Sequence, residues 1–190
     1  MSTYNRVIFV CSENTSRSPM AASILANMKP KLKVESRGMV VLFPEPYNPK
    51  AVAVAAKNNI IIPNNSSEEI SSADFGNDTL VLTMNAAMKQ KIYDIFEEAI
   101  NVYTLSEYAG EPDKEIINPY GKGIEEYNEC FKQIYELVSR VAVDLIDEDE
   151  SNTDEEKLES EDDADKEDIK EVPVINGNNK RQGKGQIKNN

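Results

Sequence analysis

The sequence predicts an α/β fold: a single domain with a four-stranded parallel sheet and helices on both faces. Two observations predict it. Short apolar runs typical of buried strands alternate with segments of helical periodicity, and the first strand leads through a short polar loop directly into a helix. The 190 residues fit one domain of about 150 residues with an appendage. We therefore expect a domain at residues 1–147 and a separate segment at residues 148–190.

The first half of the chain is expected to hold two strands and two helices. The apolar run at residues 7–10 predicts the first strand, and residues 20–25 lie in the first helix. Residues 33–39 alternate in polarity and have a glycine near their end, a pattern that predicts a second strand. Residues 42–47 contain two prolines, which cannot donate to a sheet, so no central strand is expected there. A short helix follows at residues 48–56.

The second half repeats the alternation. Residues 66–69, Ser-Ser-Glu-Glu, have the pattern of a capped start of another short helix. Residues 78–84 are a nearly continuous apolar run and predict a central strand. Residues 85–98 predict a helix capped by its first residue, an asparagine. Residues 101–105 predict a fourth strand, and the last helix is expected over residues 124–146.

The loop after the first strand, Cys-Ser-Glu-Asn-Thr-Ser-Arg-Ser-Pro, carries the chemistry. It lies where a parallel sheet binds ligands, and its N–H groups together with a helix N-terminus can cradle a phosphate. Cys11 is a candidate nucleophile, and Arg17 can hold two phosphoryl oxygens. Ser18 is expected to donate to the Cys11 sulfur, and Asn14 to tie the loop to its surroundings. The other candidate substrate-binding residues of the loop are Ser12, Glu13, Thr15 and Ser16.

The string Val-Ile-Phe-Val-Cys-x-x-Asn-x-x-Arg-Ser-Pro-Met-Ala resembles the signature of the low-molecular-weight protein tyrosine phosphatases. The thioredoxin-coupled arsenate reductases share much of it. The resemblance covers roughly residues 4–146 and implies a phosphatase I-like fold, phosphorylated protein substrates, a phosphocysteine intermediate on Cys11, and no metal or organic cofactor. Thr15 resembles the corresponding residue of the bacterial protein-arginine phosphatases of this family, so phosphotyrosine and phosphoarginine both stay open as substrates.

The resemblance also implies a general acid in an Asp-Pro-aromatic turn just before the last helix. Here the turn has Asn118 in place of the acid. An amide cannot give up a proton to a leaving group, so we expect slow turnover of ordinary substrates. Asp113 and Glu115 lie nearby in sequence as candidate substitutes. Tyr120 and Tyr47 are candidates to wall the pocket.

Two departures lie inside the loop. Glu13 stands where the family usually has glycine, and its carboxylate would repel a phosphate unless it points away. Ser16 stands where many members have a second cysteine, which removes the cysteine pair that arsenate reduction by a disulfide relay needs. The main alternative to an enzyme is a phosphatase-like module that binds phosphate or phosphoprotein with little turnover. Asn118 and Glu13 favour that alternative, while the intact Cys11 and Arg17 favour the enzyme.

Composition excludes several other functions. The net charge is −13. Residues 147–190, with 15 acidic and 7 basic residues, contribute −8, and residues 1–146 contribute −5. Because both parts are acidic, no basic face for binding nucleic acid is expected. The absence of histidine excludes Cys-His and Ser-His-Asp mechanisms and most zinc sites. The chain has two cysteines and neither a long apolar run nor a leader, which predicts a cytoplasmic protein that does not enter a membrane. Cys130 is expected to be a core residue.

The acidic segment at residues 148–190 lacks aromatic residues and is expected to be disordered. Its apolar patch at residues 172–175 is a candidate motif for a partner whose identity the sequence does not give. A scaffold role through this segment is compatible with either function of the domain.

Overall fold

The computed structural model describes residues 4–145. They form a single α/β domain around a four-stranded, all-parallel sheet with the strand order β2-β1-β3-β4, which confirms the predicted fold class. The strands are β1 (Arg6–Cys11), β2 (Lys33–Gly38), β3 (Thr79–Thr83) and β4 (Val102–Thr104). The expected domain boundary, the acidic segment and its apolar patch at residues 172–175 all lie outside the described residues.

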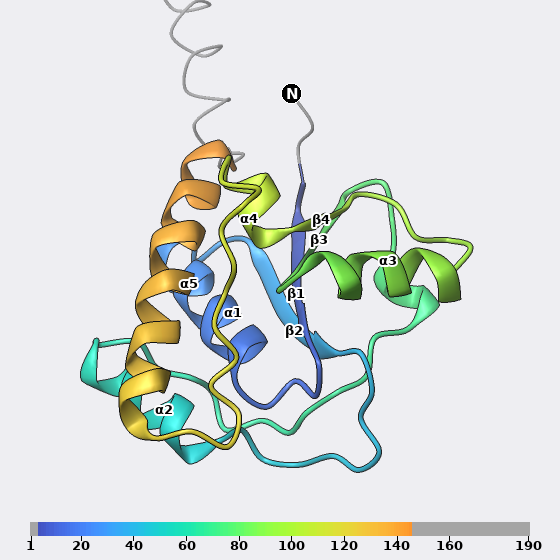
Figure 1. Ribbon diagram of the computed structural model, residues 1–190. Coiled ribbons are helices and arrows are strands. Elements are labelled where there is room, and N and C mark those ends of the chain that lie inside the picture. The colour runs from blue at the N-terminus through green and yellow to red at the C-terminus, as the bar shows by residue number, and fades with distance from the viewer. Residues whose placement is uncertain (1–3, 146–190) are drawn as a thin grey trace, which may run out of the picture. The chain divides into compact units, whose positions relative to one another are not determined.

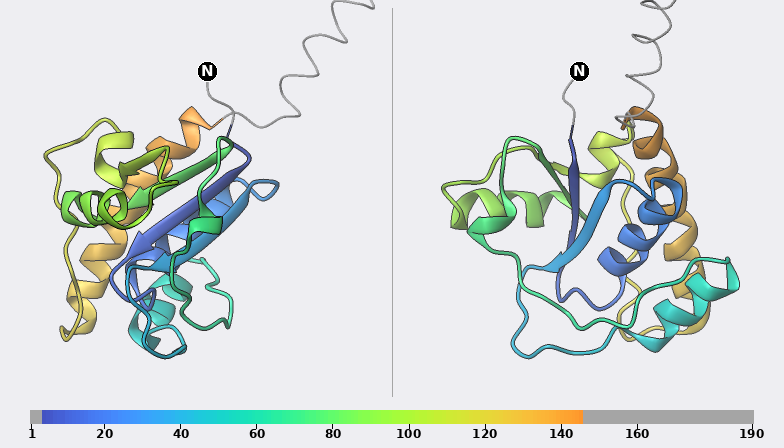
Figure 2. Two further views of the ribbon diagram at one scale, coloured as in Figure 1. Left: turned by 90° about the vertical axis from the view of Figure 1, so that its right-hand side faces the viewer. Right: turned by 180° about the vertical axis from the view of Figure 1, so that it is seen from behind.

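Helices cover both faces of the sheet, as predicted (Figure 1). They are α1 (Arg17–Met28), α2 (Pro49–Lys57), α3 (Ala86–Ile95), the short α4 (Leu105–Tyr108) and α5 (Ile124–Asp144). Helices α1, α2 and α5 lie together on one side, and α3 lies on the other, as the views from the side and from behind show (Figure 2). No helix within residues 4–145 is long and apolar enough to span a membrane.

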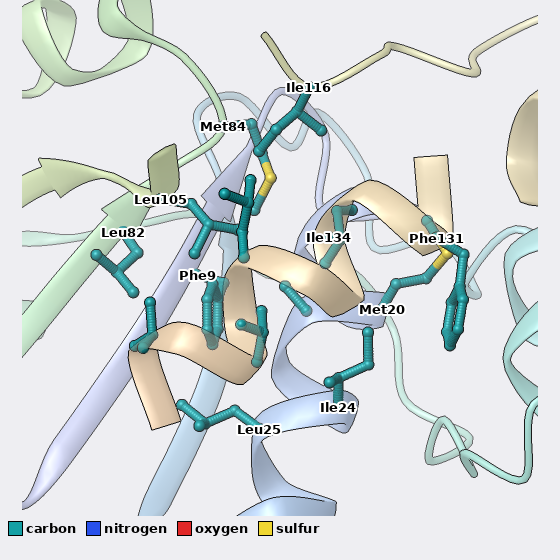
Figure 3. Packing of buried hydrophobic residues seen from close by; sticks show 14 of the residues in the cluster. Phe9, Met20, Ile24, Leu25, Leu82, Met84, Leu105, Ile116, Phe131 and Ile134 are labelled. Atoms are coloured by element: carbon teal, nitrogen blue, oxygen red, sulfur yellow. The ribbon is translucent and has the colours of Figure 1, made fainter. Parts of the chain in front are cut away.

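Strand β1 holds the domain together because it contributes to the core on both of its faces. Its neighbours β2 and β3 pair with it along both edges. Phe9 packs in the core between the sheet and α1 and α5, close to Leu82 and Leu105 (Figure 3), whereas Ile8 and Val10 belong to the core on the α3 side. Cys11 lies at the end of this buried strand, paired with Gly38 of β2.

The prediction that a helix starts at residues 66–69 is wrong, because the structure has no helix there. The backbone of this segment pairs beside the end of β2 instead: Gly38 N donates to Glu68 O at 2.8 Å, and Ile70 N donates to Gly38 O at 3.0 Å. The local capping pattern is overridden by this tertiary pairing. A single 3₁₀ turn follows at Ser72–Asp74.

The other predicted elements lie within a few residues of their expected bounds, with one addition. Asn85 caps α3 by accepting a hydrogen bond from Met88 N at 2.9 Å, but the helix ends at Ile95 and not at residue 98. The additional element is α4, whose start is fixed by a capping box in which Thr104 and Glu107 each accept the other's backbone N–H.

A network of ion pairs links the outer strand β2 to β1 and to the 3₁₀ turn that contains Asp74. Arg6 and Arg37 each bind both Glu35 and Asp74, with N–O distances from 2.6 to 3.2 Å. Burial raises the pKa of Glu35, but hydrogen bonds and charge from the two arginines outweigh it and lower the pKa to about 2. The carboxylate of Glu35 thus stabilises the fold only while it is ionised.

This network makes stability depend on pH below about 4.5. Because the pKa of Glu35 is depressed in the folded state, its contribution is present above its ordinary value near 4.5 and is lost as the pH falls towards about 2. Glu35→Gln should therefore lower the free energy of unfolding at pH 7. The difference in this free energy between the variant and the parent should shrink as the pH falls from 4.5 to 2. Urea unfolding at several pH values measures this. Glu98→Gln, an exposed residue without an ion pair among residues 4–145, is the control. A gap that stays constant with pH would contradict the assignment.

Gly38, at the end of β2, lets the loop after β1 approach closely. A Cβ built there would lie 2.9 Å from the backbone carbon of Glu13 and 3.0 Å from Asn14 N. Only the third neighbour, Val41 Cγ2 at 2.8 Å, belongs to a side chain that can move aside. A side chain at this position therefore has to displace the backbone of the loop.

Gly38→Ala should lower the free energy of unfolding by about 1–3 kcal/mol, the usual cost of overpacking. The matched control is Gly76→Ala, because its Cβ would meet only side-chain oxygens of Asp78 and Thr79, at 3.2 and 3.5 Å. Chemical denaturation of both variants measures the difference. Equal free energies of unfolding for the two variants would contradict the claim that a side chain at position 38 has to displace the loop backbone.

Candidate functional site

The candidate residues meet in a small pocket of about 90 Å³ at the carboxyl end of β1. Its lining residues, all of them predicted, are Cys11, Ser12, Glu13, Thr15, Ser16, Arg17, Asn118 and Tyr120. The other two predicted residues, Asn14 and Ser18, are fully buried and contact the loop from behind. A pocket of this volume has room for a group of about the size of phosphate, with the rest of a substrate outside.

The thiol of Cys11 lies within hydrogen-bond distance of a buried hydroxyl. Ser18 Oγ is 3.1 Å from Cys11 Sγ and 3.2 Å from the carbonyl oxygen of Arg37. One hydroxyl proton can serve only one of these acceptors at a time. A cysteine attacks as its thiolate, and a hydroxyl that donates to sulfur can hydrogen-bond to that thiolate.

Asn14 holds the loop in shape. Its backbone has a φ of 56°, in the left-handed region that asparagine tolerates better than most residues. Its side-chain Nδ2 donates to Ser18 Oγ at 3.0 Å and to Ser36 Oγ at 2.8 Å, while its Oδ1 accepts from Glu68 N at 2.9 Å. The predicted tie thus joins the loop to α1, to β2 and to the segment beside β2.

Three carbonyl groups at the end of β1 and in the loop accept hydrogen bonds from neighbouring segments. The carbonyl bonds run from Met39 N to Cys11 O (2.9 Å), from Val40 N to Ser12 O (3.1 Å) and from Asn48 N to Thr15 O (2.8 Å). Within the described part of the chain, none of the backbone N–H groups of residues 12–18 donates to a protein acceptor. A row of unused donors at a helix N-terminus is what an anion needs.

Arg17 adds a full positive charge that forms no ion pair with a carboxylate of residues 4–145. The other arginines between residues 4 and 145 are Arg6, Arg37 and Arg140, and each has an acidic partner. Arg17 is only 5% exposed, and within the described part of the chain its guanidinium donates to Ser12 Oγ alone, at 3.3 Å. Its guanidinium is therefore free to hold phosphoryl oxygens.

Asn118 and Tyr120 form part of the rim. Both are exposed, and Asn118 Oδ1 accepts a hydrogen bond from Tyr120 N at 3.4 Å. Asp113 and Glu115, the candidate substitute acids, line a different pocket near the ends of β3 and β4. Glu13 is instead the one carboxyl group among the residues that line the Cys11 pocket.

Two further predictions concern residues near the site. Tyr47 does not wall the pocket: it lies beside α1 and β2, facing a separate surface cavity. Cys130 is a core residue, as predicted, and its thiol donates to the Ile117 carbonyl at 3.2 Å. Burial raises the pKa of Cys130 to about 12, against a smaller lowering by the charge of Arg17, so this thiol stays protonated and unreactive.

Sequence reasoning missed the residues that hold the loop from outside. They are Ser36, Gly38 and Glu68, all distant from the loop in sequence. Only the glycine at the end of a strand was visible as a signal, and nothing local marks the other two. Among residues 4–145 no group of acidic or cysteine side chains is arranged to hold a metal ion.

Comparison with known proteins places this site in a family. The pattern that defines the family "Low molecular weight phosphotyrosine protein phosphatase" matches residues 6–152. A low molecular weight protein-tyrosine-phosphatase, PtpB, of Staphylococcus epidermidis is 32% identical over 136 residues, which are 72% of this chain and 96% of the relative. A protein-arginine-phosphatase of Geobacillus stearothermophilus is 32% identical over 142 residues, covering 74% of this chain and 95% of the relative.

A solved structure agrees in fold. It is the YwlE arginine phosphatase in a cysteine-to-serine mutant with a phosphorylated active-site serine, and it is 28% identical with a TM-score of 0.68. It covers 73% of this chain and 94% of its own. The match spans the whole sheet and the loop that follows β1, and the chain belongs to the low molecular weight phosphotyrosine protein phosphatase family.

Proposed function

We propose that this protein removes phosphoryl groups from phosphotyrosine or phosphoarginine in proteins through a phosphocysteine intermediate on Cys11. The observation that carries the proposal is the Ser18 hydroxyl 3.1 Å from the Cys11 sulfur, in a pocket with unused loop N–H groups and an unpaired Arg17. A pure binding site gains nothing from a sulfur that is prepared as a nucleophile. The family membership and the cysteine-to-serine relative that carries a phosphorylated serine support the same chemistry.

In the first step the Cys11 thiolate attacks phosphorus, and the bond from phosphorus to the leaving group breaks. Arg17 and the N–H groups of residues 12–18 hold the phosphoryl oxygens and offset the charge that builds up on them. Water then attacks the phosphocysteine, and the thiolate leaves while Ser18 donates to it. Both steps use only groups of this chain, water and the substrate.

The weak point of this reaction is proton delivery to the leaving group. Asn118 cannot supply a proton, and Asp113 and Glu115 line another pocket. Loss of a general acid slows the step it serves by about a hundredfold to ten-thousandfold. The enzyme is therefore fast only with leaving groups that depart without a proton.

Phosphotyrosine and phosphoarginine are both candidate substrates of the proposed enzyme. Relatives named for each activity are 32% identical to this chain. Thr15 lines the pocket with a hydroxyl that can accept a hydrogen bond from a guanidinium, which favours phosphoarginine, and the aromatic ring of Tyr120 at the rim favours phosphotyrosine. We place the activity in the cytoplasm, where the Cys11 thiol stays reduced.

The test is hydrolysis of para-nitrophenyl phosphate, phosphotyrosine peptide and phosphoarginine peptide by the parent, Cys11→Ser and Asn118→Asp. Cys11→Ser should abolish turnover of all three. Asn118→Asp should raise kcat for phosphotyrosine about a hundredfold or more and should raise it much less for para-nitrophenyl phosphate, whose leaving group needs no proton. Asp113→Asn, which changes an acid in the neighbouring pocket, should leave the rates unchanged and serves as the control.

A second candidate function is a binding module that captures phosphate or phosphoprotein. Asn118 and the carboxylate of Glu13 at the pocket favour it. No turnover in the parent or in Asn118→Asp, with phosphate still bound, would overturn the enzyme and establish the module.

A further inference from the structure

The rim residues Asn118 and Tyr120 lie on a segment that is neither helix nor strand, between α4 and α5 (Figure 1). We call residues 117–122 the rim segment. Its internal hydrogen bonds run from Tyr120 N to Asn118 Oδ1 (3.4 Å) and from Lys122 N to Pro119 O (3.0 Å). Within the described part of the chain, no hydrogen bond joins residues 118–121 to another element. The hydrogen bonds that fix the rim segment are therefore those at its two ends.

The end next to Asn118 is held by two side chains of α5. Ile117 N donates to Gln133 Oε1 at 3.0 Å, and Cys130 Sγ donates to Ile117 O at 3.2 Å. The two partners are three positions apart on one helix, so their side chains lie on the same face. Both backbone polar groups of Ile117 thus bond to α5. The bond to Gln133 is the stronger of the two, because a thiol is only a weak donor.

The other end is held by α2. Lys50 Nζ donates to the carbonyl oxygen of Lys122 at 2.6 Å. Helix α2 is itself joined to the Cys11 loop, because Asn48 N, at the N-cap of α2, donates to Thr15 O at 2.8 Å. The rim segment is therefore anchored to two helices, and one of them is bonded to the loop that holds the nucleophile.

The bond between Ile117 and Gln133 lies near the surface. Ile117 is exposed and Gln133 is half-buried. If the amide of Gln133 is removed, water can take its place at Ile117 N, so the fold loses little free energy. What changes is the freedom of the residue that follows, Asn118, and of the rim segment with it.

The rim segment faces the part of a substrate that lies outside the phosphoryl group. The Cys11 pocket, of about 90 Å³, has room for a group of about the size of phosphate. The side chain that carries the phosphoryl group must therefore pass between the lining residues at the rim, which include Asn118 and Tyr120. Gln133 does not line this pocket.

We propose that Gln133 is a positioning residue. By accepting the Ile117 N–H it holds Asn118 and Tyr120 where they contact the side chain that carries the phosphoryl group. This deepens the proposed function and rests on it for the identity of the substrate. Gln133 acts on binding of the phosphorylated side chain and not on binding of the phosphoryl group itself, which the loop N–H groups and Arg17 hold.

Calorimetric titration in a Cys11→Ala background tests the proposal without turnover. The ligands are a phosphotyrosine peptide, a phosphoarginine peptide and inorganic phosphate. Adding Gln133→Ala should weaken binding of the phosphopeptide by about three- to tenfold, the value of one hydrogen bond. The affinity for inorganic phosphate and the unfolding temperature should not change, because the loop and the core are untouched.

A conservative variant and a control separate positioning from a general effect. Gln133→Glu keeps an oxygen that accepts from Ile117 N, so it should restore the phosphopeptide affinity. Gln90→Ala is the control, because Gln90 is a glutamine of α3 whose Nε2 donates to Asp94 Oδ1 at 2.9 Å, away from the pocket. It should change neither affinity. Unchanged phosphopeptide affinity in Gln133→Ala, an equal loss in Gln133→Glu, or an equal loss for inorganic phosphate would overturn the proposal.

The two proposals fail in different ways. Turnover by the parent together with unchanged phosphopeptide affinity in Gln133→Ala would overturn the positioning role alone. A parent that hydrolyses nothing, with the expected loss of phosphopeptide affinity in Gln133→Ala, would overturn the phosphatase and support the role of Gln133. A protein that binds neither phosphopeptide would overturn both.

Discussion

The site depends on the buried side chain of Asn14 more than on any other contact. One amide group donates to Ser18 on α1 and to Ser36 on β2, and accepts from the backbone of Glu68. With its nitrogen serving the Ser18 oxygen, the proton of that hydroxyl is left for the sulfur or for the Arg37 carbonyl. The curvature of the loop and the environment of the thiol are therefore set by the same residue.

Much of this arrangement could be predicted from the sequence because its signals are local. The apolar composition of residues 7–10 indicates a buried strand. Because the loop residues are consecutive in sequence, a single strand-loop-helix unit brings Cys11 and Arg17 together. Asn118 and Tyr120 were placed at the pocket by the family's turn before the last helix, and the structure has them there.

What could not be predicted depends on contacts between distant segments. The pattern at residues 66–69 favours a helix locally, yet its backbone pairs with Gly38, some thirty positions earlier. No rule of spacing indicates that Asp113 and Glu115 face a different pocket from Asn118, because their placement follows from the path of the chain between α4 and α5. That Ser16 leaves its helix uncapped also becomes visible only when its hydroxyl is located.

The burial of Arg17 decides the range over which the site attracts its ligand. The net charge of residues 1–146 is −5, and Arg17, which lines the pocket, is a buried residue. An approaching phosphorylated protein therefore meets a mostly acidic molecule at distance and a positive charge only on contact. Mobile ions screen the first of these interactions much more than the second. Added salt would thus speed the encounter with an acidic substrate, the opposite of the behaviour of enzymes that steer their ligands with a basic surface.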